Sequence, residues 1–423
     1  MNNVIILGSG IAGLAASYGL GHNATIYEAR ETVGGLCDSF NIQGFCFDNA
    51  VHFSFAKEER AIPFFQKTEH FSHPPDAWNF AQEFWIRHPV QNNLHALPIE
   101  ERIKAISGFF KRPPLQENVE TFQQWLHIQF GDYIATEFPE RYTRKYWREE
   151  ASVLGTDWVG YRMYRPSEEE VLYGAFSSET KNVYYADAML YPKTGGFIRF
   201  LDPLRKNARI VFSKCSELID VKKKMIFFTD GTSVTYDHLI STLPLTKIVQ
   251  QIKDIPTEMK DTAKQLAATQ VVIVSMGFKR PDIMKYLWWY IYDEDILAAR
   301  IYSSGLKSPN NVPKNCGAIQ MECYLHPGKE KFLSEDYYIN NALYALEKMK
   351  LASKNEPLFV DVRLLPYGNV IHYPDTRSRA DKIQKYLKSI DILSAGRFGE
   401  WKYYWTDQAL VSGLNAAEEL KLM

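Results

Sequence analysis

The feature that most constrains the fold is the opening of the chain, where a short apolar run leads directly into a glycine-rich turn. Residues 4–7 read VIIL, a continuous apolar stretch typical of a parallel strand that is buried on both faces. The turn GSGIAG follows at residues 8–13, and the next residues are typical of a helix. A second short run, residues 24–27, ends at Glu28, twenty residues after Gly8. This order predicts a strand–helix–strand unit that binds a dinucleotide.

Each residue of this unit has a physical reason to be there. Gly8 permits a tight turn, Gly10 lets the backbone approach a pyrophosphate, and Gly13 lets the helix pack on the strand. The helix N-terminus offers free N–H groups and the positive end of its dipole to the phosphates. Glu28 is placed to accept hydrogen bonds from a ribose diol. A lone GxGxxG is often only a flexible turn, but the second strand and the acid favour the nucleotide site.

Composition excludes several other classes. The formal net charge of the 423 residues is −1, so no global field draws the protein to nucleic acid or to acidic membranes. The five cysteines are odd in number and contain no CxxC pair, which argues against a disulfide framework or a zinc site. No run approaches eighteen apolar residues and no leader is visible at the start, so we expect a cytoplasmic protein without a metal or a membrane partner.

The residues after the acidic strand end point to the flavin. Glu28-Ala29-Arg30 is followed by the doublet Gly34-Gly35 and Leu36, a pattern that resembles the superfamily of amine oxidases, protoporphyrinogen oxidase and UDP-galactopyranose mutase. Residues 216–245, with two expected strands, an Asp-Gly turn, a third strand and the sequence STLPL, resemble the second FAD-contacting stretch of the same superfamily. The resemblance implies that FAD is the cofactor. No second GxGxxG marks a separate NAD(P)H domain, although NAD(P)H is a candidate reductant.

We therefore expect an α/β protein in three parts. Residues 1–57, 191–248 and 386–423 are expected to form a discontinuous Rossmann-like FAD-binding domain. Residues 58–190 are expected to form a helical substrate-capping region, and residues 249–385 a substrate domain with a mixed sheet. Within this last part, residues 269–278 and 318–324 read as strands, and 334–350 as a helix with Ser334 at its N-cap.

Short motifs far apart in the chain together resemble the UDP-galactopyranose mutase family, particularly its eukaryotic-type branch. The most specific are Y-x-x-K-x-W at residues 142–147 and W-x-G-x-R at 158–162, with G-R-F-G-x-W-x-Y at 396–403 before the last helix. Three further segments agree: PVQNN at 89–93, WYIYDED at 289–295 with an arginine at 300, and HYP at 372–374.

The resemblance implies roles for individual residues. Arg300 matches the arginine that binds the substrate diphosphate, with Tyr373 and Tyr403 donating to its oxygens, and Arg162 matches an arginine on a closing loop. Arg397 matches the arginine beside the flavin, and His52 a histidine near its ring; these two and the other two arginines are the candidate catalytic residues. The matched uridine pocket contains Gln91, Tyr142, Trp147 and Tyr290, and the last helix brings Asp407 and Gln408 to the flavin.

The residue types suit such a ligand without the family. A sugar diphosphate carries about two negative charges, which forked, permanently charged arginines meet well. Tyrosine adds neutral O–H donors, and an aromatic face suits a uracil ring. The last helix, expected to begin near Thr406, would direct its N-terminus at the flavin and favour the anionic reduced form. Trp401 and Trp405 are expected to be packing residues.

Two positions and one stretch depart from the eukaryotic-type pattern. His88 stands where a tyrosine is usual beside the uracil, and Asp187 where an asparagine is usual near the sugar. The stretch from Tyr404 to Gln408 is bulkier than the small polar residues of the family. These changes leave the nucleotide base and the sugar open.

The leading hypothesis is a flavin-dependent mutase that interconverts UDP-galactopyranose and UDP-galactofuranose, or a related nucleotide sugar. The resemblance implies that N5 of reduced FAD attacks the anomeric carbon, without net redox change, in galactofuranose supply for cell-surface glycans. The alternative is an FAD-dependent oxidoreductase of the amine oxidase or protoporphyrinogen oxidase type. A non-catalytic flavin-binding protein is a third class. The chain itself leaves the oligomeric state open, and a homo-oligomer is compatible with it.

Overall fold

A five-stranded parallel sheet forms the upper part of the molecule. The structure, a computed structural model, describes residues 3–55, 57–115, 118–160, 162–179, 183 and 188–423. The strand order is β19 (Ile392–Ser394), β13 (His238–Ser241), β1 (Val4–Leu7), β2 (Ala24–Tyr27) and β9 (Arg209–Val211). All four neighbouring pairs are parallel. Strands from three distant stretches of sequence therefore build one sheet, which confirms the discontinuous Rossmann-like fold.

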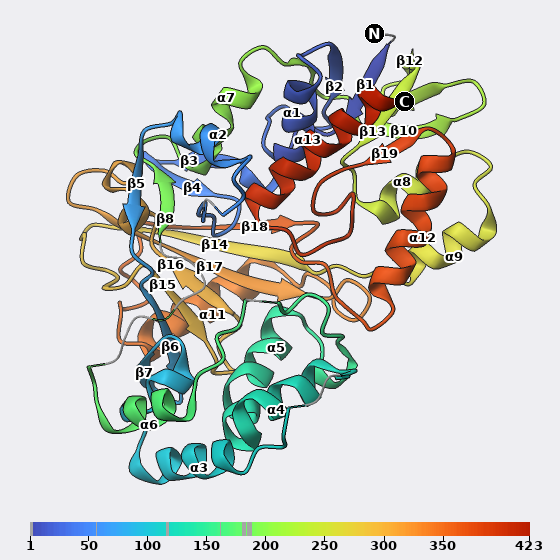
Figure 1. Cartoon of the computed structure of the whole chain (residues 1–423). Helices are drawn as coiled ribbons and strands as arrows, with labels where there is room; N and C mark the ends of the chain where they lie inside the picture. The colour runs from blue at the N-terminus through green and yellow to red at the C-terminus, as the bar shows by residue number, and fades with distance from the viewer. Residues whose placement is uncertain (1–2, 56, 116–117, 161, 180–182, 184–187) are drawn as a thin grey trace.

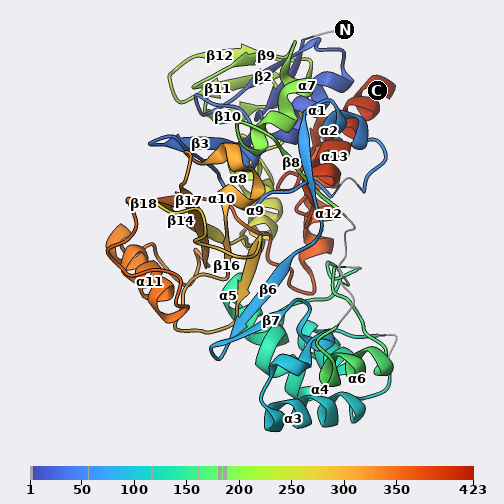
Figure 2. The same cartoon turned by 90° about the vertical axis from the view of Figure 1, so that its left-hand side faces the viewer.

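Two helices pack closely at this sheet because small residues line their contact. Helix α1 (Ile11–Gly19) lies against the last helix, α13 (Thr406–Leu422), and the two chain ends lie near each other in both views (Figures 1 and 2). A Cβ added at Gly413 would stand 2.1 Å from the carbonyl oxygen of Ala12, and one at Gly19 would stand 2.7 Å from the Cβ of Ala417. Larger side chains at either glycine would push the helices apart.

A seven-stranded mixed sheet crosses the middle of the molecule (Figure 1). Its order is β18 (Phe359–Leu365), β14 (Gln270–Phe278), β17 (Gly317–Leu325), β16 (Arg300–Tyr302), β15 (Trp288–Ile291), β6 (Ala77–Ala81) and β7 (Phe84–Arg87). Only β15 and β6 pair in parallel; the other pairs are antiparallel. The predicted mixed sheet is confirmed, and α11 (Glu335–Lys348) packs on it with Ser334 as N-cap, as expected.

Helices α3 (Ile99–Phe110), α4 (Phe122–Ala135), α5 (Arg141–Tyr146) and α6 (Glu168–Phe176) gather below this sheet (Figures 1 and 2). They form the expected helical region.

A second group of helices, α8 (Leu245–Gln251), α9 (Thr257–Lys264) and α12 (Thr376–Ser389), lies beside the parallel sheet (Figure 1). The remaining described α-helices are short: α2 (Ile62–Gln66), α7 (Asp202–Arg205) and α10 (Ser304–Lys307). The four boundaries between the five segments given above stay predictions.

Three small sheets complete the fold: β3 (Ser39–Ile42) with β4 (Phe45–Asp48), β5 (His70–His73) with β8 (Met189–Pro192), and the three strands β10 (Ser216–Asp220), β11 (Met225–Phe228) and β12 (Ser233–Thr235). The stretch 216–245 thus holds four strands rather than the expected three. The extra strand, β12, reads SVT and has exposed ends. With a single apolar residue it is too short to show the alternation of apolar and polar residues that predicts a strand.

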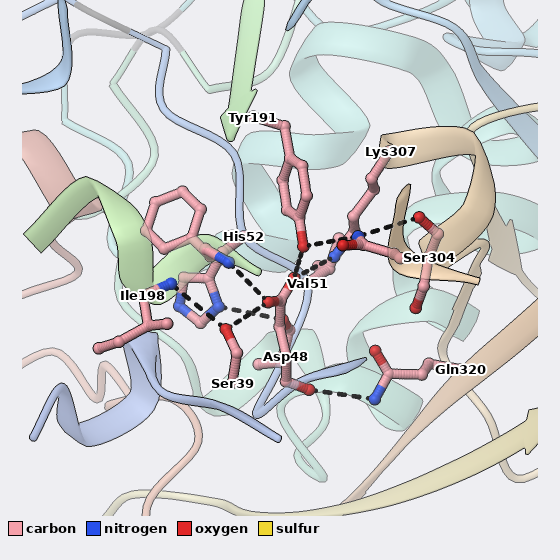
Figure 3. A network of polar contacts seen from close by, with 12 residues as sticks. Ser39, Asp48, Val51, His52, Tyr191, Ile198, Ser304, Lys307 and Gln320 are labelled. Carbon is pink, nitrogen blue, oxygen red and sulfur yellow. Dashed lines mark hydrogen bonds and ion pairs between the residues drawn. The ribbon is translucent and has the colours of Figure 1, made fainter. Parts of the chain in front are cut away.

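A buried ion pair joins the small β3–β4 sheet to the end of α10. Asp48 and Lys307 are 1% and 0% exposed, and their charged atoms lie 2.9 Å apart (Figure 3). The same carboxylate accepts hydrogen bonds from Tyr191 (2.8 Å), from Ser39 (2.8 Å) and from the backbone N–H of Phe197 (2.9 Å). Burial alone would raise the pKa of Asp48, but the charge of Lys307 and the hydrogen bond from the N–H of Phe197 hold it below its usual range. The Asp48 carboxylate is therefore well compensated where water is excluded, and it is the counter-ion of the buried Lys307.

Lys307→Met is expected to lower the free energy of unfolding by about 3–5 kcal/mol, because it leaves the buried Asp48 carboxylate without a counter-ion. The control is Lys382→Met, which removes an exposed ion pair with Glu258 and should cost less than about 1 kcal/mol. Chemical denaturation followed by tryptophan fluorescence measures both. Equal losses for the two variants would contradict this role of the ion pair.

Candidate active site

One cavity of about 520 Å³ runs from the glycine turn at the parallel sheet, past the mixed sheet, to the helical region. Most residues singled out in the sequence line it. Those at the nucleotide end are Gly8, Gly10, Glu28, Gly34, Gly35 and Leu36. Those farther along are His52, Tyr142, Trp147, Arg162, Tyr290, Arg300, Arg397 and Tyr403. Side chains from all three parts of the fold therefore face one space.

The nucleotide end has the geometry that a dinucleotide needs. Gly8 has a φ of +95°, and a Cβ at Gly13 would stand 2.0 Å from the carbonyl oxygen of Gly8, so helix and strand touch here. Gly10 is different, because a Cβ there would meet only a backbone oxygen 4.0 Å away. The Glu28 carboxylate is held by the N–H and the hydroxyl of Ser9, at 2.8 and 2.7 Å. The space beside Gly10 and a fixed acid fit a pyrophosphate and a ribose.

Arg300 enters the cavity from β16 with a buried counter-ion behind it. Its Nε and Nη2 atoms lie 2.8 and 2.6 Å from Oε2 of Glu322, which is 0% exposed, and Nη2 also donates to the hydroxyl of Tyr324. Burial alone would raise the pKa of Glu322, but Arg300 and the hydrogen bonds from Tyr324 and the N–H of Val51 hold it below its usual range. These contacts thus fix the direction of the Arg300 guanidinium, and the charge of Glu322 partly compensates its positive charge.

Glu322 also fixes the segment that carries His52. Its second oxygen accepts the backbone N–H of Val51 at 2.6 Å, and the neighbouring His52 contacts the carbonyl oxygen of Ala50 through Nδ1 at 3.0 Å. Burial lowers the pKa of His52 to about 4, and the charge of Lys307 adds to this against the charge of Asp48. His52 is therefore a neutral imidazole at neutral pH.

Two aromatic hydroxyls are paired between Arg300 and Arg397. The hydroxyl oxygens of Tyr146 and Tyr403 lie 2.7 Å apart, and the guanidinium of Arg300 stands 5.0 Å from the centre of the Tyr146 ring. Arg397 stands 4.7 Å from the ring of Tyr403 and donates to the carbonyl oxygen of Tyr404. Tyr403 therefore lies between the two arginines, where donors to an anionic ligand are useful.

Arg162 closes over the end of the aromatic run. It donates to the carbonyl oxygens of Trp158 (2.8 Å) and Tyr403 (2.7 Å), and its guanidinium stands 5.2 Å from the centre of the Trp405 ring. Trp405 lines the cavity and also packs against Phe55, with ring centres 4.8 Å apart, so its expected packing role stays a prediction. Trp401 is 1% exposed in the core, as expected. The difference arises because α13 begins at Thr406, so the extended segment before it passes along the cavity wall.

Several predicted residues lie outside this cavity. The Tyr373 hydroxyl donates instead to Glu149 at 2.6 Å, because that buried carboxylate lies beside it. Gln91 lines an adjoining space of about 80 Å³, with Nε2 donating to the backbone carbonyl oxygen of Tyr164.

Residues expected at the cofactor also lie outside the cavity. Asp407 accepts from the backbone N–H of Lys57, and Gln408 caps its own helix by accepting the N–H of Trp405. Gly13 packs against Gly8, Ala29 is exposed, and Arg30 bonds to Gly35. Asp187 lies outside the described residues.

The sequence alone did not single out four residues of the site: Tyr146, Glu322, Tyr324 and Asn369. Tyr146 stands inside the quoted motif Y-x-x-K-x-W, so position could have indicated it. Glu322 and Tyr324 lie two residues apart on β17 and so face the same side of the sheet. Arg300 on the neighbouring strand β16 pairs with Glu322 in the register, and this neighbourhood is visible only once the sheet is known. Within the described ranges, no group of histidine, cysteine or acidic side chains is placed to hold a metal ion.

Comparison with known proteins decides the family. The model for flavin-containing amine oxidoreductases matches residues 11–421, almost the whole chain. The chain belongs to this family. It is therefore a flavin enzyme, and the space at Gly10 with Glu28 fits the dinucleotide FAD. A search of the described part of the chain finds no helix long and apolar enough to span a membrane.

Solved structures of this superfamily share the fold. The chain is similar to a crystal structure of reduced UDP-galactopyranose mutase, with a TM-score of 0.92, 22% identity, and coverage of 100% of this chain and 96% of that one. It is similar to a putative protoporphyrinogen oxidase from Exiguobacterium sp. 255-15, with a TM-score of 0.76, 16% identity, and coverage of 100% and 99%. It is also similar to putrescine oxidase with bound putrescine, with a TM-score of 0.67, 14% identity, and coverage of 100% and 99%.

Gly10→Ala is expected to weaken FAD binding by roughly tenfold or more and to leave folding intact, because its methyl group enters the space that the pyrophosphate needs. Gly13→Ala should instead lower the stability of the protein by about 1–3 kcal/mol, because its methyl group meets the backbone of Gly8. Fluorescence titration with FAD and thermal melting measure the two effects. Equal FAD affinity in Gly10→Ala and the parent protein would remove that space from the cofactor site.

His52 is expected to stay neutral down to about pH 5, whereas His127, whose bonds to Asp132 and Glu140 outweigh burial and raise its pKa, should titrate above pH 6.5. In the unfolded chain His52 takes up a proton near pH 6.5, whereas in the folded protein it does so only near pH 4. The stability of the fold should therefore decrease as the pH drops from 6.5 to about 4. NMR of ¹⁵N-labelled histidines, with His52→Asn for assignment, measures both midpoints. A His52 midpoint near 6.5 would contradict its burial.

Proposed function

We propose that the protein is a flavin-dependent nucleotide-sugar mutase that interconverts UDP-galactopyranose and UDP-galactofuranose, or a related nucleotide sugar, without net redox change. The observation that carries the proposal is the pair Arg300 and Arg162 in the same cavity as Tyr403, beyond the nucleotide end that FAD fits. An amine or a porphyrinogen carries no diphosphate that would need two arginines. The mutase crystal structure with the same fold supports it.

In this proposal each residue has a defined task. Arg300, fixed by Glu322, binds the diphosphate with its outward N–H groups, and Tyr403 turns its hydroxyl proton from Tyr146, 2.7 Å away, to the diphosphate. The diphosphate is the leaving group and returns to the same carbon, so these donors must hold it in place between the two events. Arg162 screens the cavity from water by closing over Trp405.

Bound FAD in its reduced form supplies the nucleophile for the anomeric carbon. The chain contributes the environment: Arg397 lines the cavity as a positive charge near the cofactor, and His52 adds a neutral imidazole. With Nδ1 against the carbonyl oxygen of Ala50, the proton of His52 sits on Nδ1 and its Nε2 is an acceptor. Such an acceptor can take the proton of the sugar hydroxyl that attacks the anomeric carbon when the ring recloses.

Aromatic residues at the far end of the cavity suit the nucleobase. Tyr142 and Tyr290 line it with Trp147, and their rings meet edge to face at a centroid distance of 5.4 Å. Burial lowers the pKa of His88 to about 3, so this wall carries no positive charge from it. A neutral aromatic wall favours a planar, uncharged base such as uracil.

A second candidate is an oxidoreductase acting on an amine or a porphyrinogen. The family description and the structures of putrescine oxidase and a putative protoporphyrinogen oxidase favour it. The two candidates differ in affinity for free UDP, which only the mutase needs to bind. Cytoplasmic location, NAD(P)H as reductant and a homo-oligomeric state belong to the proposal as well.

Arg300→Ala is expected to raise the dissociation constant of UDP and to lower turnover, each by roughly tenfold or more, because the charged contact to the diphosphate is lost. Isothermal titration with UDP measures the first, and turnover of the nucleotide sugar by the dithionite-reduced protein the second. The control is Arg363→Ala, which removes an arginine of β18 that pairs with Asp361 and does not line the cavity.

Two results would count against this proposal. No binding of UDP by the parent protein would remove the diphosphate site, and oxidation of an amine with release of hydrogen peroxide would favour the second candidate. Equal UDP affinity in Arg300→Ala and the parent protein would leave the site but exclude Arg300 from it.

A further inference from the structure

Asn369 lies where the three parts of the fold meet at the cavity. Its side-chain oxygen accepts a hydrogen bond from Nη2 of Arg397 at 2.6 Å and from the hydroxyl of Tyr146 at 3.1 Å. Arg397 follows the last strand of the parallel sheet, and Tyr146 ends helix α5 of the helical region. Asn369 itself lies in the connection after β18 of the mixed sheet and lines the cavity.

The backbone of Asn369 is fixed to the mixed sheet. Its N–H donates to the hydroxyl of Thr269 at 2.9 Å, and its carbonyl oxygen accepts the N–H of Thr269 at 2.8 Å. Thr269 is 0% exposed and directly precedes β14, and Asn369 is 4% exposed. The amide oxygen therefore has little freedom, and the guanidinium of Arg397 is held where this oxygen places it.

An asparagine is a costly choice at this position. Both donors point at the oxygen, so the orientation of the amide is set, and its buried NH₂ group has no hydrogen-bond partner among the described residues. An aspartate would satisfy Arg397 and Tyr146 equally well and would leave no donor unpaired. Stability alone thus favours a carboxylate here, and a neutral acceptor has another use.

That use follows from the charge of Arg397. Its remaining bond goes to the carbonyl oxygen of Tyr404, so no carboxylate pairs with it in the part of the chain that the structure describes. Arg300, in contrast, has Glu322 as a counter-ion. Arg397 also follows Gly396, at which a Cβ would stand 2.8 Å from that of Ala12 in the first turn of α1, so it lies at the cofactor end of the cavity.

We propose that Asn369 is a positioning residue that holds Arg397 with a neutral acceptor and so leaves its positive charge uncompensated beside the flavin. This charge stabilises the anionic reduced flavin relative to the oxidised form and raises its reduction potential. The inference rests on the flavin lying beside Arg397, as in the proposed function, and it needs no nucleotide sugar.

The test is Asn369→Asp in the FAD-loaded protein. The carboxylate keeps both hydrogen bonds but neutralises Arg397, so the reduced flavin should be bound about tenfold less favourably relative to the oxidised form. For a two-electron couple this lowers the midpoint potential by about 30 mV. Spectroelectrochemical or dye-coupled titration measures it, with FAD content and melting temperature recorded alongside.

Two controls separate this role from a structural one. Asn341→Asp adds the same charge at an asparagine whose side-chain oxygen is likewise an acceptor, from the backbone N–H of Leu297. Asn341 lies on α11 away from the cavity, so the flavin potential should not move in this variant. Arg397→Gln should lower the potential by itself. Adding Asn369→Asp to Arg397→Gln should then lower it by much less than in the parent protein, because a buried carboxyl without the arginine beside it stays protonated and neutral.

An unchanged potential in Asn369→Asp with full FAD content would overturn the proposal, as would an equal additional shift in the Arg397→Gln background. Should Asn369→Asp fail to fold, Asn369→Ser replaces it, because the shorter hydroxyl releases Arg397 and should also lower the potential. Asn369→Ser at the parent potential would overturn the proposal. A shifted potential in Asn369→Asp, together with no nucleotide-sugar turnover by the parent protein, would support the role of Asn369 and contradict the mutase proposal.

Discussion

The arrangement of the site depends on one buried carboxylate, Glu322. It accepts from Arg300 on one side and from the backbone N–H of Val51 on the other, residues that come from the mixed sheet and from the segment leading to His52. A carboxylate with 0% exposure is stable only when such donors compensate its lost hydration. Meeting this requirement brings the arginine proposed for the diphosphate into a fixed relation with the histidine proposed to lie near the flavin, before any ligand binds.

Two arginines of the cavity, Arg300 and Arg397, differ in how their charge is compensated. Arg300 has an ionic partner, whereas Arg397 bonds to an amide and a carbonyl oxygen of the described residues. A fixed, partly neutralised arginine suits a ligand that must be held and also released. An arginine without a counter-ion among the described residues keeps a stronger field, which suits the reduced flavin of the proposed mechanism. The same residue type thus serves different tasks, depending on the protein group to which its guanidinium bonds.

The sequence was sufficient for the nucleotide end of the fold, because Gly8, Gly10, Gly13 and Glu28 act within one short stretch and local spacing carries their geometry. It indicated β14, β17 and α11 through apolar runs and a cap. The rest of the site depends on long-range pairing: Val51 and Glu322 are 271 residues apart, and no local pattern joins them. The same holds for Tyr373, whose hydroxyl donates to Glu149, 224 residues away in the sequence, so no local pattern joins them; its role at a diphosphate stays a prediction.

The most direct test of the mutase account is to incubate the purified protein with UDP-galactofuranose, with and without prior reduction by dithionite, and to separate the products by chromatography. The account predicts UDP-galactopyranose in the reduced sample only, because the proposed nucleophile exists only in reduced FAD. Equal conversion without reduction would contradict the role of the reduced cofactor. No conversion in either sample, together with no binding of UDP, would contradict the account as a whole.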